Sequence, residues 1–148
     1  MAKVIAIGQP ENEAERKAIA FLRDNLPDTY TLIHNFEILT PQRKYEIDIA
    51  LIAPHSLFII DVKHIVGAID IYRRTWYPQG RGSYPSPLLK LHSHSKFIKG
   101  LITSTHSAQP DLRKLYSQPV ILMTANTVVN DNSGADKDEI IRLGQECL

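Results

Sequence analysis

Two short apolar runs separated by four residues constrain the fold of this chain more than any other feature. The first run covers residues 45–52 and the second covers residues 57–63, and both are rich in isoleucine and leucine. The segment between them, residues 53–56, has a length that suits a tight connection between antiparallel strands. We therefore predict a β-hairpin in which Ile52 pairs with Leu57.

That register brings charged side chains into facing positions. Asp48 would lie opposite Asp61, and side-chain alternation places Lys63 on the same face as Asp61. Two carboxylates that face each other across paired strands repel, so a fold retains them most readily around a cation. Glu46 would lie opposite Lys63, and an ion pair between these two is a structural alternative that explains Lys63 without catalysis.

The charged residues of the hairpin are the parts that hydrolysis of a phosphodiester requires. The carboxylates of Asp48 and Asp61 can hold Mg²⁺ or Mn²⁺, and the main-chain oxygen of Val62 is a further candidate ligand. Such a cation acidifies a bound water and neutralises charge on phosphorus. Lys63 can orient the water and stabilise the developing charge. The sequence thus predicts a metal-dependent site on this hairpin.

An acidic residue of the first predicted helix is a further candidate for this site. The helix covers residues 10–26, and its apolar stripe includes Ala18 and Leu22. Glu15 lies on that stripe, from which it could reach the hairpin site. The alternative is a frayed first turn in which the Glu15 carboxylate stays in water.

The remaining pattern alternates between strand and helix signals. The predicted elements are a strand or arm at residues 1–9, strands at 30–39, 68–72 and 119–124, and helices at 88–105 and 135–143. Residues 73–87, with their prolines and glycines, are predicted to form a loop. The order of helix, three strands, helix and strand predicts an α/β layer architecture with a mixed sheet.

The net charge of +1 hides a one-sided segment. Residues 71–110 contain no Asp or Glu, but they carry nine basic or histidine side chains: Arg73, Arg74, Arg81, Lys90, His92, His94, Lys96, Lys99 and His106. This bias favours a phosphate-facing surface, and the alternative is a solvated basic face. Nearby aromatic residues can stack on bases, but packing is the role that we favour for them: Tyr72, Trp76, Tyr77 and Tyr84.

Composition and motifs exclude several classes of function. No apolar run approaches the length needed to cross a bilayer, and the N-terminal residues lack the features of a secretory signal. The single cysteine, Cys147, permits no internal disulfide and no thiolate zinc site, and the histidine spacing does not suit zinc either. Neither a Gly-rich phosphate loop nor a Gly-x-Ser-x-Gly nucleophile elbow occurs. We therefore expect a cytoplasmic protein without membrane contact.

The motifs around the hairpin resemble those of a known family. Residues 46–48, 53–63 and 67–69 carry the resemblance, with residues 14–16 upstream and Trp76 and residues 85–88 downstream. They resemble the nuclease-related domain (NERD) family, a branch of the PD-(D/E)xK nuclease superfamily, over roughly residues 11–101. The pattern is most similar to the N-terminal region of the large NERD–protein kinases of BREX/Pgl phage-defence systems.

The resemblance implies a restriction-endonuclease-like core, in which a mixed central β-sheet is flanked by helices. It also implies that Asp48 and Asp61 bind the metal. Lys63 would then aid catalysis, and Glu15 would support the site. The chain departs from the family pattern at two positions, because Ile47 replaces the superfamily's proline and Asp61 stands where many NERD proteins have Glu. The motif permits either acid.

The expected function is metal-dependent cleavage of nucleic acid, and of DNA in particular, in anti-phage defence. The candidates for holding its phosphates are Arg73, Arg74, His92, Lys96 and Lys99. We expect residues 1–148 to form one NERD domain, the N-terminal part of a larger protein, which can form a homodimer and contact other phage-defence proteins. The alternative is a module that senses DNA or a partner without cutting and regulates an attached serine/threonine protein kinase.

Overall fold

The computed structural model describes residues 1–105, 115–131, 134 and 136–143, so His106 and Cys147 lie outside the described residues. Its N-terminal elements are β1 (Lys3–Ala6), α1 (Glu13–Asn25), β2 (Thr31–Leu39), β3 (Lys44–Ile52), β4 (Ser56–Lys63) and β5 (Gly67–Tyr72). The elements that follow are β6 (Thr75–Pro78), β7 (Tyr84–Pro85), α2 (Pro87–Thr105), β8 (Tyr116–Met123), β9 (Thr127–Asp131), the 3₁₀ turn η2 (Lys137–Glu139) and β10 (Ile140–Arg142).

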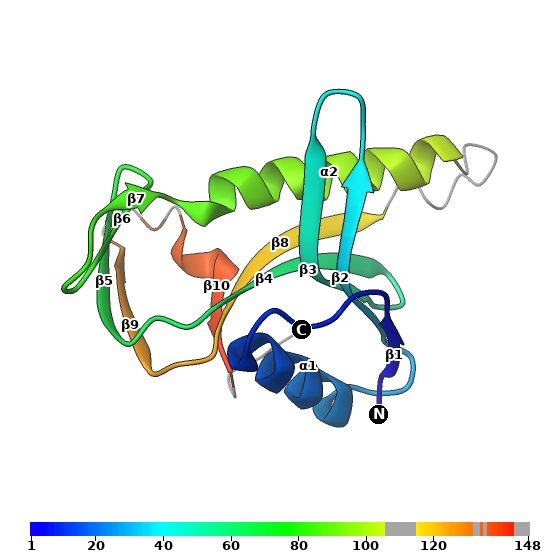
Figure 1. The fold of residues 1–148 in the computed structure, drawn as a ribbon, viewed down its shortest axis with the longest axis horizontal. Coiled ribbons are helices and arrows are strands. Elements are labelled where there is room, and N and C mark those ends of the chain that lie inside the picture. The colour runs from blue at the N-terminus through cyan, green and yellow to red at the C-terminus, as the bar shows by residue number, and fades with distance from the viewer. Residues whose placement is uncertain (106–114, 132–133, 135, 144–148) are drawn as a thin grey trace.

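A six-stranded mixed sheet forms the centre of the molecule, in the order β1-β2-β3-β4-β8-β10. Strands β2, β3 and β4 pair with one another in antiparallel orientation, whereas β1 pairs with β2, β8 with β4 and β10 with β8 in parallel. Helix α2 lies on one side of this sheet and α1 on the other (Figure 1). The predicted α/β architecture, a restriction-endonuclease-like core with a mixed sheet between helices, is confirmed.

The predicted hairpin register is confirmed at its closed end. Ile52 pairs with Leu57, and the antiparallel ladder continues as far as the pair Ile49–Ile60. Strand β4 also pairs along its whole length with β8, in parallel. Residues 57–60 of β4 pair with a strand on each edge, and all four of these side chains are apolar.

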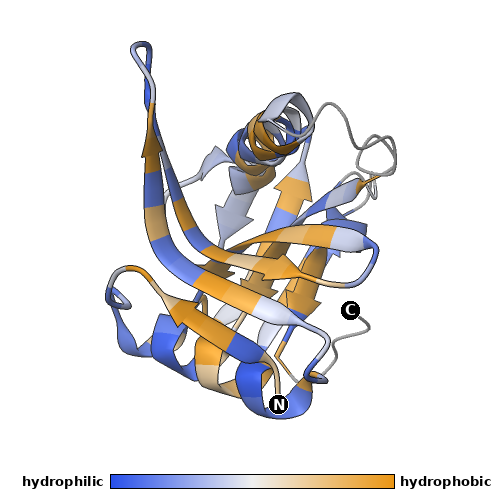
Figure 2. Cartoon of the chain, turned by 90° about the vertical axis from the view of Figure 1, so that its right-hand side faces the viewer, coloured by the Kyte–Doolittle hydropathy of each residue, from blue (hydrophilic) through white to orange (hydrophobic). Residues whose placement is uncertain are grey.

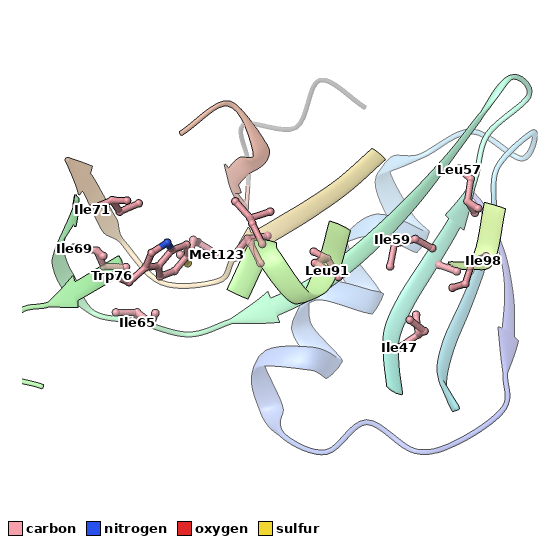
Figure 3. Close-up of a cluster of buried hydrophobic side chains, with 13 residues drawn as sticks. Ile47, Leu57, Ile59, Ile65, Ile69, Ile71, Trp76, Leu91, Ile98 and Met123 are labelled. Atoms are coloured by element: carbon pink, nitrogen blue, oxygen red, sulfur yellow. The ribbon is translucent and has the colours of Figure 1, made fainter. Parts of the chain in front are cut away.

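Each face of the central sheet packs against one helix. On the α1 side, the helix stripe packs on strand residues that include Leu32, Ile49, Leu51, Ile60, Val62 and Leu122. On the α2 side, a second cluster runs from β3 and β4 under the helix to the β5–β6 region (Figure 3). The β2–β3 hairpin projects past α2 to a hydrophilic tip (Figures 1 and 2).

Strand β3 contributes to both clusters, and its buried side chains do not follow one strict alternation. Ile49 packs with the α1-side cluster, while Ile47, two residues earlier, packs with the α2-side cluster. Side chains two apart lie on one face of a straight strand, so β3 must twist between these positions. Asp48 is the residue at that twist.

A second sheet was not predicted. Residues 68–72 were expected to be a further hairpin-linked strand, but β5 pairs with β6 and β9 in a separate four-stranded sheet, in the order β7-β6-β5-β9. The predicted loop over residues 73–87 is wrong for the same reason, because β6 and β7 lie within it. Strands β4 and β8 pair in parallel in the central sheet. The strands that follow them in the chain, β5 and β9, pair in parallel again in the second sheet.

The predicted third helix at residues 135–143 is also wrong. Residue 135 lies outside the described residues, and the rest form the 3₁₀ turn η2 and strand β10. In β10, Ile140 pairs with Ile121 and Ile141 pairs with Leu122 at the edge of the central sheet. Two adjacent β-branched residues beside an open sheet edge favour strand pairing over the helical charge pattern.

Trp76 anchors the second sheet. Its side chain is fully buried, and its Nε1 donates a hydrogen bond of 2.9 Å to Asp136 Oδ2. The packing role is therefore confirmed for Trp76, while Tyr72 and Tyr77 are exposed. No helix in the described ranges is long and apolar enough to span a bilayer.

Candidate active site

The backbone pairing of β3 with β4 ends before Val62, where the Asp48 side chain becomes the hydrogen-bond partner of β4. Beyond the pair Ile49–Ile60, the amide of Val62 donates a hydrogen bond of 3.0 Å to Asp48 Oδ2. Amide and carbonyl of a strand residue point toward the same neighbouring strand, so the Val62 carbonyl oxygen also lies on the Asp48 side. The local twist of β3 thus brings one carboxylate and one main-chain oxygen together.

Asp61 and Lys63 complete this cluster from β4. Lys63 Nζ lies 3.2 Å from Asp61 Oδ2, and both side chains are partly buried. Side-chain alternation places them on one face, as predicted. The alternative partner Glu46 forms its ion pair with Lys44 instead, at 2.8 Å. Lys63 is therefore held by the acidic cluster and not by a cross-strand pair with Glu46.

The environment of Asp48 opposes its ionisation. Burial raises its pKa to about 8, and the hydrogen bond to Asp61 and the charges of Asp61 and Glu15 act in the same direction. The Val62 amide opposes this shift because it donates to the carboxylate. A carboxyl whose ionisation is disfavoured beside two other acids indicates a site with too little positive charge to neutralise all three carboxylates.

Glu15 is buried near this pair. Only 3% of its surface is exposed, so the interpretation as a frayed, solvated turn is wrong. Its Oε1 accepts hydrogen bonds from Asn35 Nδ2 at 2.7 Å and from the amide of Glu11 at 3.2 Å. Asn12 caps α1 through a 2.9 Å bond from the Glu15 amide to its Oδ1, which fixes the first turn.

Asn35 connects Glu15 to the hairpin. In the β2–β3 register the flanking pairs His34–Ile49 and Phe36–Ile47 place Asn35 opposite Asp48. Its backbone has a φ of 55°, in the left-handed region that asparagine tolerates better than most residues. A Cβ on Gly8 would lie 2.4 Å from the carbonyl oxygen of Asn35, so only glycine allows this close approach.

A cavity of about 550 Å³ opens over these side chains. Asp48, Asp61 and Lys63 line it from the sheet, and Asn35 lines it from β2. Helix α2 supplies the opposite wall, which includes Lys90 and His94. Glu15 does not line the cavity itself, so it acts on the site through Asn35 and through its charge.

The family model of the nuclease-related domain matches residues 10–124, which include the hairpin, both helices and β8. The chain belongs to the NERD family. Comparisons with curated proteins and with solved structures found no match. Membership of this nuclease-related family suggests a nuclease-like function.

The donor set of this NERD site fits a hard divalent cation. Two adjacent carboxylates and a main-chain oxygen correspond to the one or two carboxylates that commonly bind Mg²⁺ in a site open to substrate. No group of three or more acidic, histidine or cysteine side chains in metal-binding proximity occurs in the part of the chain that the structure describes. For a cation held there, water and substrate oxygens would supply the remaining ligands.

The predicted phosphate-holding residues lie away from this cavity. None of the five, Arg73, Arg74, His92, Lys96 and Lys99, is among its lining residues. Two are engaged elsewhere, because Arg74 Nη2 lies 3.3 Å from the buried Asp136 and His92 Nε2 lies 2.7 Å from Glu139. Arg73 and Lys96 are exposed. A contact of these five residues with phosphate stays a prediction.

Lys90 and His94 were not singled out in the sequence, although both belong to the basic segment. They flank the apolar stripe of α2 on one side, whereas His92, Lys96 and Lys99 flank it on the other. Helical spacing reveals the two sides but not which of them faces the carboxylates. That choice depends on how α2 packs on the sheet.

Proposed function

We propose that this NERD domain hydrolyses phosphodiester bonds of nucleic acid, with DNA as the substrate, in a reaction that depends on Mg²⁺ or Mn²⁺. The observation that carries the proposal is the convergence of Asp48, Asp61 and Lys63 on one cavity, with the pKa of Asp48 raised. A surface ion pair would not need a second buried carboxyl beside it.

The cation would be held by Asp48, Asp61 and the main-chain oxygen of Val62. When bound, it supplies positive charge to the scissile phosphate and lowers the pKa of water. The protein's part is to keep both carboxylates adjacent before the cation arrives. The Val62 amide does this for Asp48, and the Lys63 ammonium does it for Asp61.

Lys63 is the residue that acts on the reacting atoms. Its ammonium lines the cavity and can donate to the attacking water or to a non-bridging phosphate oxygen. The water oxygen forms a bond to phosphorus, its proton passes to solvent, and the bond from phosphorus to the leaving oxygen breaks. That oxygen then takes a proton from solvent. Glu15 is held by Asn35, and its negative charge contributes to the raised pKa of Asp48.

Cleavage of a supercoiled plasmid and of a labelled oligonucleotide tests the proposal. The wild-type protein is incubated with Mg²⁺, Mn²⁺ or EDTA, beside the variants Asp61→Asn and Lys63→Ala. We expect cleavage only with a divalent cation, and a loss of at least about 100-fold in both variants because transition-state contacts are removed.

Matched controls come from exposed positions. Asp28→Asn removes one carboxylate from an exposed turn, and Lys3→Ala removes one exposed ammonium from β1. Both controls should cleave as the wild type does. Absence of metal-dependent cleavage in the wild type, or wild-type rates in Asp61→Asn, would leave the module that senses without cutting as the better description.

The setting that we propose rests on the resemblance to BREX/Pgl NERD–protein kinases. In that setting the domain acts in the cytoplasm in anti-phage defence, at the N-terminal part of a longer chain. A homodimer would bring two sites to the two strands of a duplex. Phage plating on cells that carry the wild-type gene or the Asp61→Asn gene tests the defence role, which predicts protection only by the wild type.

A further inference from the structure

We propose that Lys90 and His94 form a phosphate-binding subsite on the α2 wall of the cavity, which holds a nucleic-acid phosphate next to the one that is cleaved. This subsite deepens the proposed function and rests on it. It adds two contacts from a helix to a site otherwise built on the sheet. The ligand is an anionic phosphodiester oxygen.

The first observation concerns His94, which is buried but incompletely bonded. Only 3% of its surface is exposed, and its Nε2 has no hydrogen-bond partner among the described residues. The ring packs edge-on against Tyr45 with a centroid distance of 5.2 Å, so its orientation is held by the core. A buried ring nitrogen without a protein partner at the wall of a cavity is available to a ligand bound there.

The second observation concerns Lys90, one helical turn before His94. Its side chain is exposed and lines the same cavity. Residues four apart lie on one face of a helix, so both groups serve the same wall. The opposite wall carries Asp48 and Asp61. The cavity between the two walls can take the backbone of a nucleic-acid strand.

The charge of the two groups selects the ligand. Burial lowers the pKa of His94, and the cations Lys90 and Arg43 lower it further, against the opposing charges of Asp61 and Glu46. The imidazole is therefore a neutral donor at neutral pH, and Lys90 supplies the positive charge. A lysine ammonium beside an imidazole N–H suits an anionic oxygen, and the ammonium repels a metal cation.

A structural role for His94 makes a different prediction from a binding role. As a core residue only, His94 would contribute through its ring contact with Tyr45, and His94→Phe would retain most of that contact. As a ligand of phosphate, it would lose its function in the same variant, because phenylalanine has no donor. His94→Phe thus separates the two roles in one protein.

Equilibrium binding of a labelled oligonucleotide tests the subsite. Binding is measured with Ca²⁺ as the cation, and gels verify that the oligonucleotide stays intact. We expect Lys90→Ala and His94→Phe each to weaken binding by about tenfold, with thermal stability close to that of the wild type. Lys90→Ala should also reduce the salt dependence by about one counterion. Lys3→Ala, which removes an equal charge at a distance, should change affinity less than about twofold.

Neutral methylphosphonate linkages locate the contact. Scanning one linkage at a time should find a phosphate whose neutralisation weakens binding by the wild type but adds nothing in Lys90→Ala. Additive losses at every position, or unchanged binding in both α2 variants, would overturn the subsite. Should His94→Phe fail to fold, Lys90→Ala and the linkage scan decide the outcome.

The outcome for the subsite is separate from that for catalysis. Wild-type cleavage with unchanged binding in the α2 variants would reject the subsite alone. Binding that depends on Lys90 and His94 without cleavage in any divalent cation would reject the nuclease alone. No binding by the wild type would reject the subsite, while the plasmid assay still judges the nuclease.

Discussion

The amide of Val62 donates to Asp48 Oδ2 at 3.0 Å, where the backbone pairing of β3 with β4 has already ended. This bond keeps a carboxylate within the sheet and replaces the carbonyl that a continued ladder would supply. It therefore holds Asp48 beside Asp61 without help from a ligand. Two acids kept adjacent in this way destabilise the protein until a cation or a proton lies between them.

Replacing Asp48 with asparagine is expected to stabilise the metal-free protein above neutral pH. The pKa of Asp48 is raised from 3.8 to about 8, so the native state keeps a proton that the unfolded chain loses. Stability from this group is complete below about pH 4 and is lost as pH rises through about 8. Asparagine resembles the protonated acid, so we expect Asp48→Asn to melt about 5 °C above the wild type near pH 8 in EDTA.

The pH dependence of the two melting temperatures supplies a control for this prediction. The two melting temperatures should converge below about pH 4, where the wild-type Asp48 carboxyl is protonated in both the native and the unfolded state and the asparagine is neutral in both. Asp28→Asn, at an exposed turn, should follow the wild type at every pH. Parallel curves for wild type and Asp48→Asn would show that Asp48 ionises normally in the fold.

A divalent cation is expected to stabilise the wild type and not the Asp61→Asn variant. Mass action adds about 2.7 kcal/mol when the free cation is a hundredfold above its Kd. Because the cation must displace the proton of Asp48, its affinity should increase with pH up to about 8. Thermal melts with Mn²⁺ at several pH values measure this effect, and an equal shift in Asp61→Asn would place the cation elsewhere.

Arg74→Ala and Arg73→Ala are expected to differ in their effect on the free energy of unfolding, although the two residues are neighbours. Arg74 lies 3.3 Å from Asp136, whose side chain is fully buried, so Arg74→Ala leaves that carboxylate without its cation. Because Arg74 is itself 40% exposed, we expect a loss of about 2 kcal/mol in the free energy of unfolding, below the range for a fully buried pair. Urea unfolding measures this loss.

Arg73→Ala is the matched control for that measurement. Its side chain is exposed and lies over the Tyr72 ring, with the guanidinium carbon 5.2 Å from the ring centroid. We expect its free energy of unfolding to change by less than about 0.5 kcal/mol. If Arg74→Ala proves equally mild, the ion pair with Asp136 does not hold Arg74, and the residue is available to phosphate.

The hairpin and its carboxylates could be predicted because their signals are local. The four-residue connection determines the register next to the turn, and the register determines which side chains face each other as far as the pair Ile49–Ile60. The place of Glu15 on the apolar stripe of α1 pointed toward the core but left a solvated first turn open, and only the structure shows that Glu15 is buried. Each of these inferences needs only neighbours in sequence or one short turn.

The second sheet and the correct side of α2 could not be predicted in this way. Membership of β5 in a separate sheet depends on its pairing with β9, which lies far along the chain. The 73–87 segment has the composition of a loop, and β6 is a strand because its neighbours pair with it. Lys90 and His94 differ from His92 and Lys96 only in how α2 packs on the sheet.

Asn35 provides the last prediction, because its backbone and its side chain have separable roles. Asn35→Ala and Asn35→Gly both lose the side-chain hydrogen bonds to Glu15 and His34, but only the alanine variant must also hold a φ of 55° with a Cβ. We therefore expect the glycine variant to be more stable than the alanine variant by about 1 kcal/mol in urea unfolding.

This order reverses the usual preference, since glycine inside a strand is about 0.5–1 kcal/mol less stable than alanine. Position 33 in the same strand supplies the control, because Ile33 pairs regularly with Ala50 and Ile33→Gly should be less stable than Ile33→Ala. Both Asn35 variants leave the buried Glu15 carboxylate without its 2.7 Å donor, so both should also lower kcat for cleavage. A glycine variant less stable than the alanine variant would show that Asn35 adopts ordinary strand geometry. The bond to Glu15 would then have to form without the left-handed backbone at Asn35.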